Sequence, residues 1–138
     1  MVSWDDVRAQ ALALPGVTER VSRGAVEWRV RDRLFLWERP LRRADLEALG
    51  AAAPDGDLLA AYVPGLVAKE ALLADDPMLY LTTPHFDDLP IVLVRLERLP
   101  ADELAELVGE AWLERAPARL VREHPEVGAV GRPPEAAN

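Results

Sequence analysis

The chain has 138 residues, half of them apolar, which is typical of one globular domain with a substantial core. It contains no cysteine, which excludes disulfides, thiolate chemistry and sulfur-ligated metal. No apolar run is long enough to span a bilayer, and the acidic N-terminus does not resemble a signal peptide, so we expect a cytoplasmic protein without a membrane partner. The net charge of −8 disfavours non-specific binding to nucleic acid, which depends on phosphate neutralisation.

Basic residues are concentrated in one segment of this acidic chain. Eight of the sixteen lie between Arg20 and Arg43, where only three acidic residues oppose them, so the segment carries a net +5 and the rest −13. The eight are Arg20, Arg23, Arg29, Arg31, Arg33, Arg39, Arg42 and Arg43. A local positive field on an acidic body indicates a partner rather than a fold.

The first predicted element is a helix. Ser3 followed by Asp6 is a capping-box pattern, and Pro15-Gly16 ends the helix. Its apolar face consists of Trp4, Val7, Ala11 and Leu14.

A β-hairpin is predicted next. Val26–Val30 alternates between apolar and charged residues, Leu34–Trp37 is apolar, and Arg31-Asp32-Arg33 forms the turn between them. The alternation places Trp28 toward the core and Arg29 toward solvent.

The remaining elements complete an α+β pattern. We expect helices over 44–49, 67–74 and from Pro100 onward, the last interrupted at Pro117, and strands over 58–63, 78–82 and 91–96. Neighbouring strands with short links favour an antiparallel β-sheet covered by helices. We expect a single domain over residues 1–124 and a disordered tail over 125–138, where Gly, Pro and Ala dominate.

The arginine-rich hairpin is the first candidate site. Arginine fits phosphate bidentately, and a two-stranded ribbon can contact the nucleic-acid backbone. The candidate nucleic-acid-binding residues are Arg29, Arg31, Arg33, Arg42 and Arg43. The alternative is a solvated face whose arginines pair with the many acidic residues elsewhere.

The second candidate is the loop over residues 83–90. His85 lies there beside Phe86, Asp87 and Asp88, so the loop offers an imidazole, an aromatic ring and two carboxylates. Three adjacent ligands are too few for a structural zinc site, so we expect no metal and no cofactor, and a loop that is structural or covers a pocket. Lys69, the one lysine, is a further ligand-binding candidate unless it is simply solvated.

No pattern for a common enzyme class is present. The two serines, Ser3 and Ser22, lie in no nucleophile-elbow motif, and the glycines form no phosphate-binding loop. The sequence therefore favours a binding module over an enzyme and leaves catalysis open.

Several segments together resemble the MmcQ/YjbR family. They are Leu12–Glu19, the Val26–Val30 strand, Thr83–Phe86, the helix from Pro100 and Ala116–Val121, so the resemblance covers roughly residues 4–122. It implies an antiparallel α+β fold of the CyaY-like or double-wing type and a DNA-binding role. Two functional hypotheses follow: a non-enzymatic module that binds DNA or another polyanion through the arginine-rich hairpin, or a module that binds a small molecule or protein partner through the His85 loop and the sheet face.

Overall fold

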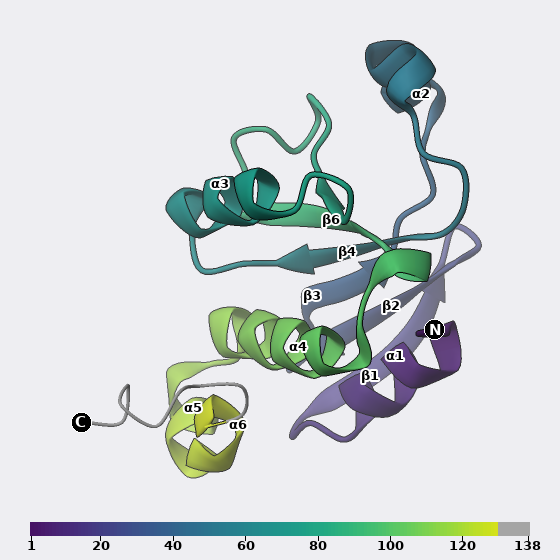
Figure 1. Ribbon diagram of the computed structural model, residues 1–138. Helices are drawn as coiled ribbons and strands as arrows, with labels where there is room; N and C mark the ends of the chain where they lie inside the picture. Colours follow the sequence, from purple (N-terminus) through teal and green to yellow (C-terminus); the bar gives the residue numbers. More distant parts are fainter. Residues whose placement is uncertain (130–138) are drawn as a thin grey trace.

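The computed structural model describes residues 1–129 and contains a six-stranded antiparallel sheet in the order β1-β2-β3-β4-β6-β5 (Figure 1). The strands are β1 (Val17–Ser22), β2 (Ala25–Val30), β3 (Arg33–Glu38), β4 (Leu58–Tyr62), β5 (Tyr80–Leu81) and β6 (Ile91–Arg95). The helices are α1 (Trp4–Leu12), α2 (Arg43–Leu49), α3 (Leu66–Asp75), α4 (Ala101–Arg115), α5 (Ala118–Glu123) and α6 (Pro125–Ala129). The predicted α+β class is confirmed.

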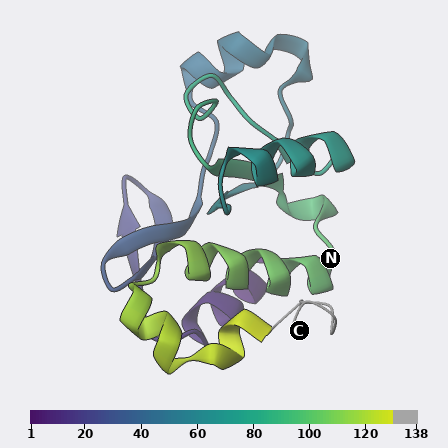
Figure 2. The ribbon, with the colours of Figure 1, turned by 90° about the vertical axis from the view of Figure 1, so that its left-hand side faces the viewer.

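The helices are distributed unevenly around the sheet. α1 and α4 pack side by side over one face, whereas α2 and the α5–α6 pair lie at opposite ends of the molecule (Figures 1 and 2). The predicted capping box of α1 is present, because the Asp6 amide donates to Ser3 Oγ and the Ser3 amide donates to the Asp6 carboxylate. No helix within residues 1–129 is both long and apolar enough to cross a membrane.

Two tight turns make β1, β2 and β3 a continuous meander. Arg23-Gly24 joins β1 to β2 and Arg31-Asp32 joins β2 to β3, and all four residues have positive φ. Two central residues with positive φ match the twist of the flanking strands, as in type I′ hairpins. The β2–β3 hairpin is therefore confirmed, with a turn one residue shorter than predicted.

The sequence does not predict β1. The strand lies at the sheet edge, and its four central residues are exposed, so it lacks the apolar alternation of a half-buried strand. The predicted strand at 78–82 is reduced to the two residues of β5.

A β-bulge explains the apolar run at 34–37. Trp28 pairs with Leu36 but Arg29 pairs with Leu34, so Phe35 is the extra residue on β3. Phe35 and Leu36 are both buried in the core beneath α4, while Leu34 packs on the opposite face of the sheet.

Both faces of the central strands are apolar. Leu59, Ala61, Val92 and Val94 belong to the main core, which also contains Trp28 and Trp112. The alternate residues of β4 and β6 form a smaller cluster on the other face, namely Leu58, Ala60, Ile91 and Leu93, together with Trp37 and Phe86. We call this second side of the sheet the open face. The loop over 83–90 packs against this smaller cluster, whereas the long helix α4 packs against the main core on the other side.

The predicted tail begins too early. Residues 125–129 form α6, and Val127 is buried in the main core. Pro125 suits the first position of a helix, and Gly109 of α4 has no side chain to hold α6 away: a Cβ built there would lie 4.0 Å from the Val127 carbonyl oxygen. Residues 130–138 lie outside the described part of the chain.

Candidate binding groove

A cavity of about 530 Å³ lies on the open face and combines residues from both candidate segments. We call it the groove; it is lined by Ser22, Arg23, Ala25, Glu27, Leu34, Trp37, Glu38, Arg39, Pro40, Arg42, His85 and Phe86. The β1–β2 turn, strands β2 and β3, the segment entering α2 and the tip of the 83–90 loop thus meet in one place. Parts of the arginine-rich segment and of the His85 loop, which the sequence presents as separate candidates, therefore line one cavity.

Two exposed arginines line the groove without a side-chain partner. Within residues 1–129, neither the Arg23 nor the Arg42 guanidinium takes part in a hydrogen bond or an ion pair with another residue. Arg23 is held in the β1–β2 turn at φ 52°, and the Arg42 amide donates to the Asp45 carboxylate at 2.8 Å, which fixes the backbone at both positions. These two cations remain available to an anionic ligand.

Arg39 has a different role, because its guanidinium is already occupied. It is 4% exposed, forms an ion pair of 3.0 Å with the buried Asp45 carboxylate, and lies over the Phe86 ring at 5.1 Å. Burial by itself would raise the pKa of Asp45, but the Arg42 amide and the Arg39 charge outweigh it and hold that pKa below its ordinary value. The Thr83 hydroxyl lies close enough to contribute, although it falls short of hydrogen-bond geometry. This pair attaches α2 to the end of β3 and to the loop.

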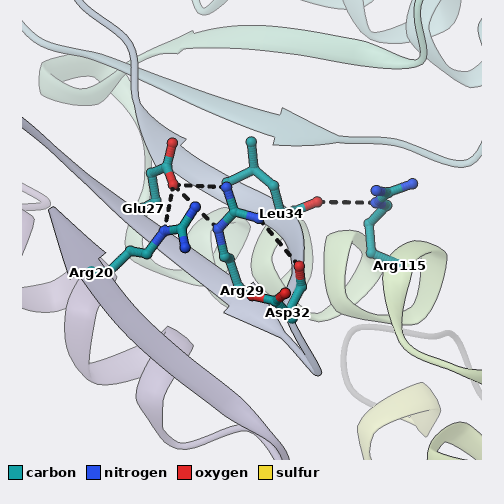
Figure 3. A network of polar contacts seen from close by, with 6 residues as sticks. All are labelled: Arg20, Glu27, Arg29, Asp32, Leu34 and Arg115. Carbon is teal, nitrogen blue, oxygen red and sulfur yellow. Dashed lines mark hydrogen bonds and ion pairs between the residues drawn. The ribbon is translucent and has the colours of Figure 1, made fainter. Parts of the chain in front are cut away.

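Arg29 is not the exposed phosphate ligand that the sequence predicts. Its side chain is half-buried and donates to the Glu27 carboxylate at 3.0 and 3.2 Å and to the Asp32 carbonyl at 3.2 Å. Arg20 approaches the same carboxylate at 3.3 Å, so both arginines point toward Glu27 (Figure 3). The charge of Arg29 is thus largely balanced within the sheet.

The other four arginines predicted to bind nucleic acid lie in different surroundings from Arg29. Arg31 lies in a cavity with Arg119 of α5, and Arg33 donates to the Arg115 carbonyl at 3.4 Å. Arg43 is exposed and pairs with Glu47 one turn along α2. Of the five arginines singled out in the sequence, only Arg42 lines the groove.

His85 and Phe86 form one wall of the groove. The exposed His85 ring meets the Phe86 ring edge-on, with centroids 4.8 Å apart. Phe86 packs against Trp37 of β3 at 6.3 Å and is 5% exposed, so it supports the wall while His85 forms its rim.

Lys69 is a structural residue and does not line the groove. It lies on α3, is 3% exposed, and its ammonium donates to the carbonyls of Phe86 and, at 2.9 Å, Leu89. Burial lowers the pKa of Lys69, and the nearby Asp87 and Asp88 carboxylates partly offset this effect. Three carbonyl groups of the loop, that of Asp87 included at 3.5 Å, thus lie around one ammonium.

The groove is lined by charged and aromatic groups. Within residues 1–129 no group of three or more His, Asp or Glu side chains is arranged to hold a metal ion. The lining supplies cations at Arg23 and Arg42, acceptors at Glu27 and Glu38, and apolar rings. The sequence includes Arg23 only as one member of the arginine-rich segment and does not indicate Trp37 or Glu38 as lining residues.

Similar proteins agree with the fold. Uncharacterized proteins of Mycobacterium bovis and Mycobacterium tuberculosis are each 46% identical to this chain over 125 residues, covering 88% of it and 95% of their own length. The crystal structure of Deinococcus radiodurans protein DR2400, described with a DUF419 domain, superimposes with a TM-score of 0.63 at 21% identity, over 93% of this chain and 89% of that one. The YjbR family model matches residues 12–114. The chain therefore belongs to the YjbR family.

Proposed function

We propose that this protein is a non-enzymatic binding module that holds an anionic ligand, DNA or another polyanion, in the groove. The observation that carries the proposal is the position of Arg23 and Arg42, two unpaired guanidinium groups that line one cavity at the end of the β2–β3 hairpin that lies away from its Arg31-Asp32 turn. Unpaired arginines at fixed backbone positions favour phosphate, which they can bind through two donors.

This proposal relocates the anion site from the hairpin tip to the groove. Five arginines lie in or next to the groove, namely Arg20, Arg23, Arg29, Arg39 and Arg42. Three carboxylates, of Glu27, Glu38 and Asp45, oppose them, which leaves a local excess of positive charge on a chain of net charge −8. The acidic surface around the groove repels a polyanion that would lie broadly across the protein. We therefore expect weak, salt-sensitive binding of an anionic group that reaches into the groove itself.

The small-molecule hypothesis has support at the same place. The groove volume of about 530 Å³ lies within the usual range for small-molecule sites. A small anion and a segment of a polyanion would use the same two arginines.

A charge-removal experiment tests the proposal. Binding of a fluorescein-labelled oligonucleotide is measured by anisotropy at two salt concentrations for the wild type, Arg23→Ala, Arg42→Ala and Arg43→Ala. Each groove variant should weaken binding and flatten the salt slope by about 0.7 if its arginine meets one phosphate of a single strand.

Arg43→Ala is the matched control. It removes the same charge one residue from Arg42, but its side chain is 93% exposed, pairs with Glu47 and does not line the groove. Equal losses in Arg42→Ala and Arg43→Ala would show that only net charge matters, and would refute the groove as the site.

A further inference from the structure

A row of aromatic rings crosses the open face and is capped by arginine at both ends. The Tyr62 and Trp37 ring centroids lie 5.9 Å apart, and those of Trp37 and Phe86 lie 6.3 Å apart. Arg115 lies over Tyr62 at 4.3 Å, and Arg39 lies over Phe86 at 5.1 Å. The Arg115 guanidinium donates a hydrogen bond of 3.0 Å to the Leu34 carbonyl, which fixes its position (Figure 3). The rings are therefore held in place before any ligand arrives.

The groove uses the middle of this row. Trp37 and Phe86 line it from the sheet and the loop, and His85 adds an exposed ring at the rim. The floor is nearly buried, because Trp37 is 9% and Phe86 5% exposed, so the exposed His85 ring at the rim is the ring on which a flat ligand can stack. Stacking depends on a π face and little on sequence.

The carboxylates of the lining restrict the choice of anion. The Glu38 carboxylate accepts a hydrogen bond of 2.6 Å from the Val26 amide, and Glu27 lies between Arg20 and Arg29. A ligand that carries only negative charge would meet these two acidic groups as well as Arg23 and Arg42. A ligand with N–H donors on one part and a phosphate on another would satisfy both kinds of group.

We infer that the groove binds a nucleotide unit, with its phosphate at Arg23 and Arg42 and its base on the exposed His85 ring, at the edge of the floor formed by Trp37 and Phe86. The inference rests on the proposed function and narrows its ligand to an unpaired base that carries phosphate. A double helix keeps its bases stacked and paired and offers this groove only phosphate, so the unit is a free nucleotide or part of a single strand.

The experiment compares four probes on the intact chain: pyrophosphate, adenosine 5′-monophosphate, a single-stranded oligonucleotide and the duplex of the same sequence, each titrated by calorimetry at one low salt concentration. The nucleotide should bind about tenfold more tightly than pyrophosphate, and the single strand about tenfold more tightly than the duplex, because only the first of each pair offers a base for stacking. A single strand that binds much more tightly than the nucleotide identifies a strand as the ligand, and equal affinity identifies the free nucleotide.

Two variants distinguish nucleotide binding from the more general anion binding proposed above. His85→Ala, at an exposed position, should weaken nucleotide binding about fivefold and leave pyrophosphate unchanged, whereas Arg42→Ala should weaken both. Leu89→Ala is the control, because Leu89 lies in the same loop, is 43% exposed and does not line the groove. Pyrophosphate or duplex binding as tight as that of the nucleotide and single strand, with Arg42 still required, would overturn the nucleotide inference and leave anion binding standing. Binding indifferent to Arg42, or no binding by any probe, would overturn both.

Discussion

The ammonium of Lys69 donates a hydrogen bond of 2.9 Å to the carbonyl of Leu89, and a second to the carbonyl of Phe86, from a position 3% exposed to solvent. α3 thereby fixes the loop that carries the His85–Phe86 wall of the groove. A buried charge persists when several acceptors satisfy it, and loop carbonyls supply them here.

Replacing this ammonium should loosen the loop. Lys69→Met keeps the apolar stem but leaves the Phe86 and Leu89 carbonyls without their donor, so we expect the free energy of unfolding to fall by about 2–3 kcal/mol. Hydrogen exchange should also accelerate at the Phe86 and Leu89 amides, which bond within the loop at 2.9 Å. Glu70→Gln, at the exposed neighbouring position, serves as the control. Unchanged protection of both amides in Lys69→Met would show that the loop holds its shape without α3.

The Arg39–Asp45 pair should make stability sensitive to acid. The pKa of Asp45 in the folded protein lies below the ordinary value of 3.8, so the folded state binds this proton less readily than the unfolded chain. The stabilisation is therefore fully present above about pH 4 and is lost as the pH falls through the folded-state pKa. Asp45→Asn should remove part of this acid dependence, measured by urea denaturation at a series of pH values.

The same substitution probes the buried charge of Arg39. At neutral pH, Asp45→Asn should cost about 3–5 kcal/mol, because it leaves a buried guanidinium without its counter-ion. Asp55→Asn, at an exposed position, should change neither stability nor its pH profile. A loss below about 1 kcal/mol would indicate that water replaces the carboxylate and that α2 does not depend on the pair.

Trp112 should be costly to truncate. Its side chain is fully buried beneath the sheet, and its indole Nε1 donates to the Pro15 carbonyl at 2.9 Å, joining α4 to the end of α1. Trp112→Ala should reduce the free energy of unfolding by about 3–5 kcal/mol. Val67→Ala, at a position 82% exposed, should have almost no effect. A denaturation midpoint that moves equally little in both variants would contradict the core assignment.

The tip of the β2–β3 hairpin should contribute little to anion binding. Arg31 and Arg33 follow the end of β2 that lies away from the β1–β2 turn, and neither lines the groove. Arg31→Ala and Arg33→Ala should therefore keep oligonucleotide affinity within about twofold of the wild type, apart from the general loss of one charge. Tenfold losses in these variants, with Arg23→Ala unaffected, would return the site to the hairpin tip.

The sequence predicts the main elements because their local signals are strong. The capping box at Ser3, the alternation around Trp28 and the apolar stripe of α4 each identify their element without tertiary information. β1 escapes prediction because an edge strand with exposed central residues shows no buried alternation. α6 escapes it because the five residues of this helix are too few to show a helical period, although Val127 is buried in the core. In both cases the element depends on a neighbour rather than on its own pattern.

The site is only half predictable for a related reason. The sequence indicates Arg42, His85 and Phe86 as candidates, but not that they share a cavity. Their meeting follows from the strand order, which places β6 beside β4 and lets the preceding loop fold back onto Trp37 of β3. The sequence also does not predict which charged side chains pair. Arg29 and Glu27 form an ion pair on one face of β2, whereas the Arg23 guanidinium has no such partner within residues 1–129.

The most direct test is a titration of the isotopically labelled protein with single-stranded oligonucleotide, followed by ¹H–¹⁵N correlation spectra. The amides of residues 22–27, 37–39, 41–42 and 85–86 should shift together, and so should the indole N–H of Trp37, which lines the groove. The indole N–H of Trp112, bonded to Pro15 within the core, should not move and provides an internal control. Shifts confined to Arg31–Arg33 and α5, or no shifts at any ratio of ligand to protein, would contradict the groove as the binding site.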